Sequence, residues 1–395
     1  MKSKKTLLLI IIVMMSVIGL LSTDMYLPSL PNITQEFQIL ENSTQLTISL
    51  FLAGLCFSQL IYGPLSQIFG RKHILLIGMS IFILASILCL FSKSIEMLII
   101  SRLFQGIGAA SGLTIGRTII GDVFSKKEAV KIFATVFPFV GLSPAIAPVI
   151  GGYIQTYFNW RISFALLSLL GIILLLLIIF FLPDTLDKSH KSKISLKHIF
   201  GTYGTLIKNK IFIGYALIPC IAYIAYFAYI TESAFMLSDN GYSAKIIGMS
   251  YISLSLSYVA GNLTSRKLLK YFKINKVLLI GYLIFAFSGI MMLLLSSFEF
   301  SLILFLMPIT FLTFANGFLI PLGAARVITN FSKVSGYASG LLGFLQLGSA
   351  SISSAFISFI ANKSYSILSL FIFIIAIIGF LLFYKLVVRA NIISK

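Results

Sequence analysis

Long apolar stretches separated by short polar segments run along almost the whole chain. A helix needs about 17 to 25 mostly apolar residues to cross a bilayer. Twelve stretches meet this length: 6–27, 43–64, 73–92, 97–116, 131–154, 162–183, 211–235, 245–265, 276–297, 301–323, 335–360 and 365–388. The pattern therefore predicts an all-α polytopic membrane protein with 12 transmembrane helices.

One longer polar segment, 184–210, divides these stretches into two sets of six. It is lysine-bearing and short, so we interpret it as a tether and not as a domain. Faint echoes link the two sets, such as Gly63-x-Leu65-Ser66 with Gly261-x-Leu263-Thr264. The sequence thus predicts an N-terminal six-helix bundle (1–183), an inter-half loop (184–210) and a pseudo-symmetric C-terminal bundle (211–395).

The charges fit this topology. Only 10% of the 395 residues are charged and 58% are hydrophobic, and the formal net charge is +19. Of the 30 Lys and Arg residues, only four fall in the loops expected on the outer side, namely Lys93, Arg161, Lys245 and Lys363. The positive-inside rule then predicts cytoplasmic N and C termini. The basic face suits an anionic leaflet, so we expect a lipid bilayer as partner and no nucleic acid.

Two charged residues lie close to the outer end of the first and fourth stretches. Arg102 stands a few residues inside its stretch, and Asp24 lies at a similar depth near the end of the first. A charge within the bilayer is costly, so it normally faces a partner or a polar cavity. We expect Asp24 and Arg102 to share a site. The alternatives are an interfacial Asp24 and an arginine that extends to the headgroups.

Other polar groups within the stretches are candidates for proton transfer or a substrate cavity. Of the 11 acids, only Asp24 and Glu232 fall within membrane stretches, and the three histidines, His73, His190 and His198, lie in or at the edge of the loops expected on the cytoplasmic side. Glu232 is thus the second candidate proton carrier. Asn316 with Gly317 is predicted to break the tenth stretch. The candidate cavity residues are Tyr26, Gln105, Tyr223, Tyr226, Tyr229, Asn316 and Gln346.

Several functions lack their motifs. The chain has no GxxxxGK[ST] phosphate loop, and the dipeptide Gly-Lys does not occur in it, which argues against ATP hydrolysis. Cys56, Cys89 and Cys220 are isolated in apolar stretches, which argues against disulfide or metal roles. We therefore expect no enzyme activity, no metal and no cofactor other than a proton gradient. We expect a monomeric carrier for a small-molecule substrate and protons.

The turn after the second stretch, Gly63 to Lys72, resembles the GxLxDRxGRR signature of the major facilitator superfamily. The residues kept are Gly63, Leu65, Gly70, Arg71 and Lys72. Gln67 stands where the family usually has an acid, and Ile68 where it usually has a basic residue. The resemblance implies a cytoplasmic gate at this turn, with its usual acidic charge missing.

Two further segments strengthen the resemblance. The segment RLFQGIGAA, from Arg102 through Gln105 and Gly106 to Ala110, resembles the RxxxQGxGaa signature in compressed form, with two residues instead of three between the arginine and the glutamine. This resemblance implies a proton-coupling role for Arg102. The fifth stretch is similar to the GPxxGG signature associated with exporters, through Pro144, Pro148, Gly151 and Gly152. A purely structural kink is the alternative for this stretch.

The segments STDMYLP, RLFQGIGAA and SPAIAPVIGG together look like the Bcr/CflA group of drug:proton antiporters. This resemblance implies rocker-switch export of small amphipathic drugs or toxic compounds from the cytoplasm across the bacterial inner membrane. An exporter of an endogenous metabolite or siderophore, a proton-linked importer, and a membrane sensor or scaffold remain alternatives. The fold alone does not decide among them.

Overall fold

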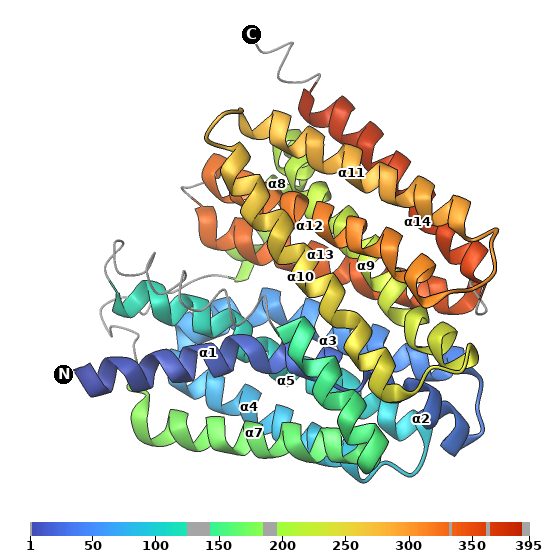
Figure 1. Ribbon diagram of the computed structural model, residues 1–395. Coiled ribbons are helices and arrows are strands. Elements are labelled where there is room, and N and C mark those ends of the chain that lie inside the picture. Colours follow the sequence, from blue (N-terminus) through green and yellow to red (C-terminus); the bar gives the residue numbers. More distant parts are fainter. Residues whose placement is uncertain (1, 125–142, 185–195, 332–333, 361–363, 389–395) are drawn as a thin grey trace. The chain divides into compact units, whose positions relative to one another are not determined.

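The described helices of the first part of the chain are long and joined by short loops. The computed structural model describes residues 2–124, 143–184, 196–331, 334–360 and 364–388. Its first helices are α1 (Lys2–Asp24), a 3₁₀ turn (Leu27–Ser29), α2 (Leu30–Phe37), α3 (Glu41–Phe69), α4 (Arg71–Leu90) and α5 (Ile95–Val123). A helix over residues 143–157 and α7 (Trp160–Phe181) follow (Figure 1).

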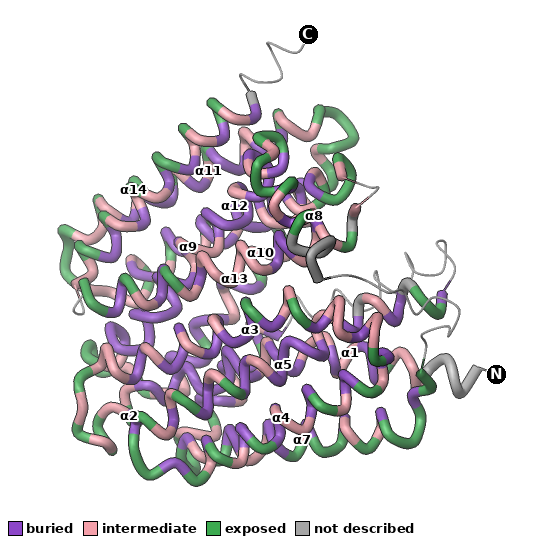
Figure 2. Tube along the Cα trace, turned by 180° about the vertical axis from the view of Figure 1, so that it is seen from behind, coloured by how far each residue is buried: buried purple, intermediate pink, exposed green. Residues whose placement is uncertain are grey.

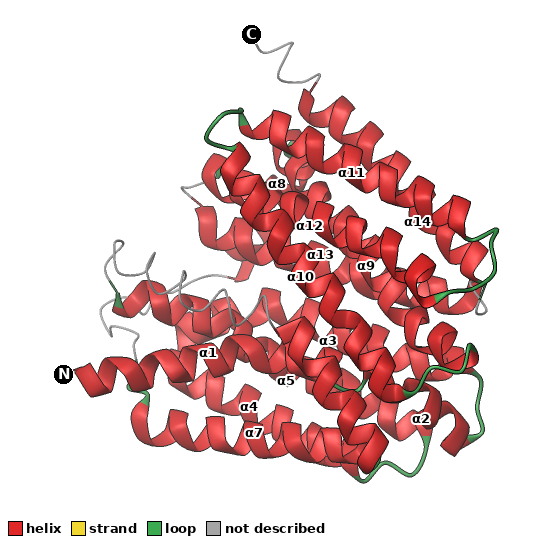
Figure 3. Ribbon diagram, in the orientation of Figure 1, coloured by secondary structure: helices red, strands yellow, loops and turns green. Residues whose placement is uncertain are grey.

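The second part of the chain repeats this pattern of long helices. Its elements are α8 (Leu196–Lys208), α9 (Lys210–Asp239), α10 (Ala244–Leu268), α11 (Ile274–Leu295), α12 (Leu302–Asn330), α13 (Ser335–Ile360), α14 (Tyr365–Phe383) and a π-helical turn (Tyr384–Val388). The described residues contain helices and loops and no strand (Figure 3).

Among the described residues, 11 segments are long and apolar enough to cross a membrane. The predicted span 131–154 begins outside the described residues and is not one of these 11. The first span is longer than predicted, since it continues through the 3₁₀ turn and α2 to Phe37. The all-α, multi-span architecture predicted from the hydrophobic pattern is confirmed.

Contacts divide the chain into two compact units. The first unit is Met1–Leu196 with Ala244–Gly248, and the second is Lys197–Ser243 with Met249–Lys395. In the first unit, α5 packs against α1, α3 and α4, and α7 packs against α1 and α4. In the second, α9 packs against α12, α13 and α14, while α11 packs against α12 and α14.

Each helix has a buried side and an exposed side. Within each unit, the helix faces directed at neighbouring helices are buried, and the opposite faces are exposed (Figure 2). The exposed faces of α7 and α14 are almost wholly apolar, and these spans have the highest mean hydropathy, 3.2 and 3.0. Such faces suit contact with lipid, because lipid does not drive apolar side chains inward as water does.

The segment predicted as a polar tether contains a helix that the sequence analysis did not predict. In α8, Tyr203 and Leu206 lie one turn apart and are buried. The Tyr203 ring packs edge-on against Tyr337 of α13, with 5.8 Å between ring centroids. The Asn209 side chain then accepts hydrogen bonds from the first backbone amides of α9. The tether is therefore helical where its apolar residues recur at helical spacing.

Candidate functional site

Arg102 lies deep in the first unit and has no exposed surface. Its helix begins at Ile95, where the Ser94 side chain caps the first turn by accepting a hydrogen bond from the Met97 amide. Arg102 follows two turns later, inside the membrane-crossing part of α5. A permanent charge at such a position requires compensation by neighbouring groups.

Three helices contribute to the bonding of Arg102. Its Nη1 donates to the backbone oxygen of Ser22 in α1 at 2.8 Å and to Oε1 of Gln105 at 2.5 Å. Gln105 in turn donates from Nε2 to the Ser86 hydroxyl of α4 at 2.8 Å. Gln105 is fully buried, and these two hydrogen bonds let its side-chain amide hold the arginine in place from one side.

Aromatic rings cover the faces of the guanidinium group. The Arg102 Cζ atom lies 4.3 Å from the ring centroid of Tyr26 and 4.1 Å from that of Phe51. Phe164 of α7 is further away, at 5.8 Å. Such contacts stabilise a desolvated cation by about 2 kcal/mol or more. Tyr26 is itself fixed by a 2.7 Å hydrogen bond between its hydroxyl and that of Thr47.

One edge of the guanidinium group has no hydrogen-bond partner in the part of the chain that the structure describes. The atoms concerned, Nε and Nη2 of Arg102, are both buried. They lie side by side along one edge of a planar group that binds carboxylates in a bidentate manner. Leaving such donors unpaired in a buried site costs free energy, so this edge is suited to a transient partner.

Asp24 is the acid nearest in sequence to this cluster. It is 5% exposed and ends α1, two residues after the Ser22 carbonyl that Arg102 binds. Arg102 attracts the Asp24 carboxylate electrostatically. Among the described residues, however, no hydrogen bond or ion pair joins the two side chains. The structure therefore brings the two predicted residues into one neighbourhood without direct pairing.

The predicted exporter segment also reaches this neighbourhood. Gly151, in the helix over residues 143–157, contacts the backbone oxygen of Met25, and a Cβ added at Gly151 would overlap that oxygen. Pro148 and Gly152 are buried and Pro144 is half-buried. The beginning of the predicted span, up to residue 142, lies outside the described residues. The described part packs directly behind Asp24.

The gate-like turn, residues 63–72, comprises the last residues of α3, Gly70 and the first two residues of α4. Gly63, Leu65 and Gln67 are half-buried, and Gly70 has a φ of 101°, a backbone conformation that favours glycine. The Arg71 side chain pairs with Asp122 of α5, with 3.0 Å between Nε and Oδ2. Its Nη1 donates to the Ser66 hydroxyl at 2.7 Å.

In the second unit, Glu232 of α9 is 1% exposed. Its two neighbours along the chain are bonded to other helices. The Thr231 hydroxyl donates to that of Ser354 in α13 at 2.8 Å. The hydroxyls of Ser233 and Tyr251 in α10 lie 2.7 Å apart. Glu232 thus lies where α9, α10 and α13 meet.

The model of the Major Facilitator Superfamily matches residues 12–354 of the chain. The chain belongs to this superfamily. The resemblance seen in the sequence is therefore confirmed, and the protein is a membrane transporter.

Curated relatives and solved structures agree with this assignment. The uncharacterised MFS-type transporter YdgK of Bacillus subtilis is 33% identical over 63% of both chains. A bicyclomycin resistance protein homolog of Haemophilus influenzae is 31% identical over 53% of both. The multidrug resistance protein MdtL of Klebsiella pneumoniae is 26% identical over 83% of this chain and 82% of its own.

The chain thus spans less than two thirds of the length of YdgK and of the Haemophilus relative, and 82% of the length of MdtL. Among solved structures, a D-xylose-proton symporter superposes with a TM-score of 0.79 at 14% identity, covering 97% of this chain and 98% of its own. At this identity the likeness shows the fold of the transporter and not its substrate.

The tyrosines predicted for the substrate cavity of this superfamily member fall into two groups. Tyr223 and Tyr226 are half-buried and each packs against Phe227, with ring centroids 5.8 and 5.5 Å apart. Tyr229 is fully buried against Phe305. Residues spaced by three drift around a helix of 3.6 residues per turn, so the three tyrosines do not share one face of α9.

The predicted break at Asn316 and Gly317 is wrong. α12 continues from Leu302 to Asn330 through both residues. Gly317 instead allows close packing, since a Cβ there would lie 2.5 Å from the Tyr258 oxygen of α10. Asn316 is 2% exposed, and Gln346 of α13 is half-buried.

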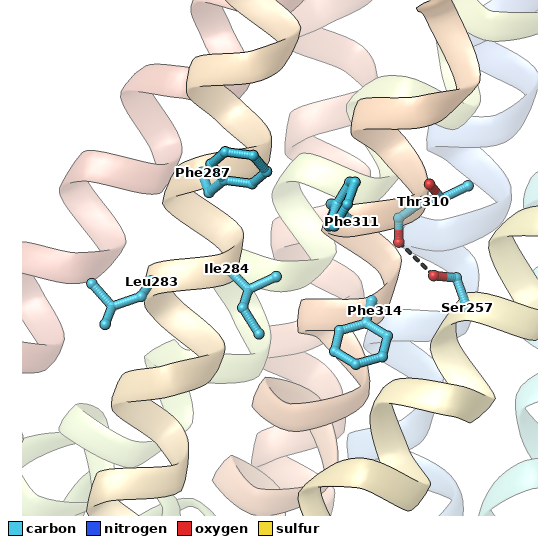
Figure 4. Close-up of a pocket in the computed structure, with 7 residues that line it drawn as sticks. All are labelled: Ser257, Leu283, Ile284, Phe287, Thr310, Phe311 and Phe314. Carbon is cyan, nitrogen blue, oxygen red and sulfur yellow. Dashed lines mark hydrogen bonds between the residues drawn. The ribbon is translucent and has the colours of Figure 1, made fainter. Parts of the chain in front are cut away.

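A cavity of about 460 Å³ lies on the second unit of the transporter, between α10, α11 and α12 (Figure 4). It is lined by Ser257, Leu283, Ile284, Phe287, Thr310, Phe311 and Phe314. The Ser257 hydroxyl donates to the Thr310 carbonyl at 2.6 Å, and no lining residue is charged. Its lining is thus mostly apolar and uncharged, whereas the Arg102 cluster contains a buried charge.

Some partners of Arg102 were not predicted. Phe51, Ser86 and the Ser22 carbonyl carry no signal of their own in the sequence, because serine and phenylalanine are common in membrane helices. Gln105 was predicted as a cavity residue, and the structure places it as a partner of Arg102. These roles depend on which helix faces pack together.

Proposed function

We propose that this transporter is a proton-coupled antiporter that exports small amphipathic drugs or toxic compounds across the bacterial inner membrane. It works by rocker-switch alternating access, as a monomer with both termini in the cytoplasm and with the proton gradient as its energy source. The similarity to a bicyclomycin resistance protein homolog and to multidrug resistance protein MdtL supports export of such compounds.

The observation that carries the coupling proposal is the incomplete bonding of buried Arg102. Its Nη1 is held by Ser22 and Gln105, while Nε and Nη2 have no partner in the described part of the chain. Asp24 lies nearby and is attracted by Arg102 without pairing with it. A small movement at the end of α1 can therefore make or break a carboxylate–guanidinium pair.

Such a pair couples proton binding to conformation. Burial favours the neutral form of a carboxylic acid, and a paired arginine favours the charged form. A state in which Asp24 is separated from Arg102 therefore takes up a proton more readily than a state in which they pair. Each ligand then shifts the equilibrium toward the state that it binds better. In antiport, proton and substrate favour opposite states.

The contact between Gly151 and Met25 supports a role for the fifth span in this cycle. A helix that packs on the backbone beside Asp24 cannot move without changing the surroundings of that carboxylate. Glu232 provides a second buried acid in the other unit. A proton that moves inward through 100 mV releases about 2.3 kcal/mol, which drives substrate outward.

Everted membrane vesicles test the proposal. Respiration acidifies their lumen, and a panel of cationic, zwitterionic and neutral drugs is then added while luminal pH is recorded. We expect at least one compound to raise luminal pH in vesicles with the wild-type protein and not in empty vesicles. Asp24→Asn should abolish this response and leave downhill substrate exchange partly intact.

Two results would contradict the proposal. Uphill transport at the wild-type rate by Asp24→Asn would remove Asp24 from the proton path. Luminal acidification on addition of substrate would indicate transport of proton and substrate in the same direction, and thus a proton-linked importer. Both results use the same vesicles and differ in the sign of the pH change.

A further inference from the structure

The turn between α3 and α4 is fastened to the end of α7 by two hydrogen bonds. The backbone amide of Arg71 donates to Oδ1 of Asp184 at 3.1 Å. The Lys72 ammonium donates to the backbone oxygen of Ile179 at 2.8 Å. Helices α4 and α7 lie side by side in the first unit (Figure 1), so both bonds join neighbouring helix ends.

The two bonds form a reciprocal cap. Arg71 is the first residue of α4, where backbone amides lack partners within the helix and the helix dipole is positive. The Asp184 carboxylate meets that end. Ile179 belongs to the last turn of α7, where carbonyl oxygens lack partners and the dipole is negative. The Lys72 cation meets that end, so each charge opposes the dipole it faces.

Gly70 keeps space for the carboxylate. A Cβ added to this residue would lie 2.5 Å from Oδ2 of Asp184, which is closer than real Cβ contacts. Its φ of 101° also turns the chain sharply between α3 and α4. Both features are needed for the Asp184 side chain to lie directly over the start of α4.

The turn needs this charge because it contains no acid of its own. Residues 63–72 carry Arg71, Lys72 and the positive end of α4, but neither Asp nor Glu. Asp122 pairs with the Arg71 side chain, with 3.0 Å between the atoms. The positive charge of Lys72 and the positive end of the α4 dipole therefore have no negative group within residues 63–72 to balance them.

We propose that Asp184 is a positioning residue that supplies the turn with the negative charge that neutral Gln67 does not provide. The carboxylate acts through its charge as well as through its hydrogen bond to Arg71. It thereby links the turn to the residue at which the inter-half loop leaves α7. The inference concerns the organisation of this turn and stands whether or not the transporter exports drugs.

Hydrogen–deuterium exchange of the full chain in lipid nanodiscs tests this, with the first-turn amides of α4 as the readout. The variants are Asp184→Ala, Asp184→Asn, and Asp184→Asn combined with Gln67→Asp. Asparagine caps a helix about as well as aspartate does but carries no charge. Glu96→Gln is the matched control, because it removes an exposed acid from the first turn of α5.

We expect Asp184→Asn and Asp184→Ala both to speed exchange in the first turn of α4, by roughly fivefold. Gln67→Asp should restore most of the protection lost in Asp184→Asn, and Glu96→Gln should leave α4 unchanged. Wild-type exchange in Asp184→Asn, with faster exchange in Asp184→Ala, would reduce Asp184 to a neutral cap and overturn the proposal. Failure of Gln67→Asp to restore protection would also overturn it.

Discussion

Both units contain helices whose backbones touch at glycines. In the first unit, a Cβ added at Gly54 of α3 would overlap the Leu103 carbonyl, and one at Gly106 of α5 would overlap the Phe51 carbonyl. In the second unit, a Cβ at Gly261 of α10 would overlap the Phe314 carbonyl of α12. Small residues allow such close approach in membranes, where apolar contact with lipid gives no drive to associate.

The residues beside these crossings differ in chemistry. One turn before Gly106 lies Arg102, with its aromatic sandwich and its bonds to α1. One turn before Gly317 lies Thr313, which is buried and donates to the Ile309 carbonyl of its own helix at 3.1 Å. The two units thus share a way of packing helices, and only the first uses the crossing to hold a charge.

The glycine crossing is therefore a shared way of packing helices, and the residues beside it determine the local chemistry. Immediately before two of these glycines, Gly106 and Gly317, stands a buried amide, Gln105 in α5 and Asn316 in α12. Gln105 is bonded to Arg102 and Ser86. The Oδ1 atom of Asn316 has no hydrogen-bond partner within the described part of the chain. Function is expected to follow the charge and not the fold.

Substitution of Arg102 should affect transport far more than substitution of Thr313. Arg102→Met removes the charge and the bonds to Ser22 and Gln105, and should lower substrate-driven proton movement by roughly 100-fold. Thr313→Val removes a hydroxyl that bonds only within α12, so its rate should stay within about twofold of wild type. Luminal pH in everted vesicles measures both. An equal loss of proton movement in the two variants would show that the buried charge of Arg102 has no special role in transport.

The next effect tests the scaffold that the units share. Gly106→Ala and Gly317→Ala should each lower the free energy of unfolding by about 1 to 3 kcal/mol, because the added methyl meets backbone atoms that cannot move aside. Thermal unfolding followed by fluorescence of the single tryptophan, Trp160, reports this change.

Gly116→Ala is the matched control for these variants. Its added methyl would lie 3.4 Å from the flexible end of Met15, in ordinary contact. Alanine also favours helix over glycine by about 1 kcal/mol, so this variant should be neutral or slightly stabilising. A loss of stability as large as that of Gly106→Ala would show that close backbone contact at the glycine does not cause the effect.

A smaller effect distinguishes the two buried amides. Gln105→Leu leaves Nη1 of Arg102 without its side-chain acceptor and should slow coupled transport by roughly tenfold. Asn316→Leu replaces an amide whose oxygen is unbonded and should have little effect. Transport rates normalised to protein amount in vesicles test the pair. Loss of transport in Asn316→Leu alone would support the prediction that Asn316 lines the substrate cavity.

The sequence predicted the spans and the presence of Arg102 in one of them, because long apolar stretches and a charge within them are local signals. It also placed Asp24 beside Arg102 through equal depth. It did not predict that Ser86, Phe51 and the Ser22 carbonyl complete the cluster, since these contacts depend on helix rotation. For the same reason the sequence predicts a break at Asn316-Gly317, although α12 continues through both residues.

The smallest expected effect concerns the first turns of α7 and α14. Glu36 of α2 binds α7 by accepting from Trp160 Nε1 at 2.6 Å and from Arg161 Nη1 at 2.5 Å. The start of α14 is held by rings instead, with the Tyr365 and Phe305 centroids 5.2 Å apart. The Tyr365 hydroxyl has no partner among the described residues.

Glu36→Gln should therefore lower stability by about 1 kcal/mol or less, because the Glu36 side chain is 41% exposed and its ion pair is screened by solvent. Tyr365→Phe should be neutral or slightly stabilising, since it removes a buried hydroxyl that is not bonded. Melting curves in about 0.1 M and about 1 M salt distinguish the two variants, because salt screens charges. High salt should reduce the difference in melting temperature between the wild type and Glu36→Gln. It should leave the difference between the wild type and Tyr365→Phe unchanged. A salt-sensitive loss in Tyr365→Phe would mean that a charged group contacts its hydroxyl.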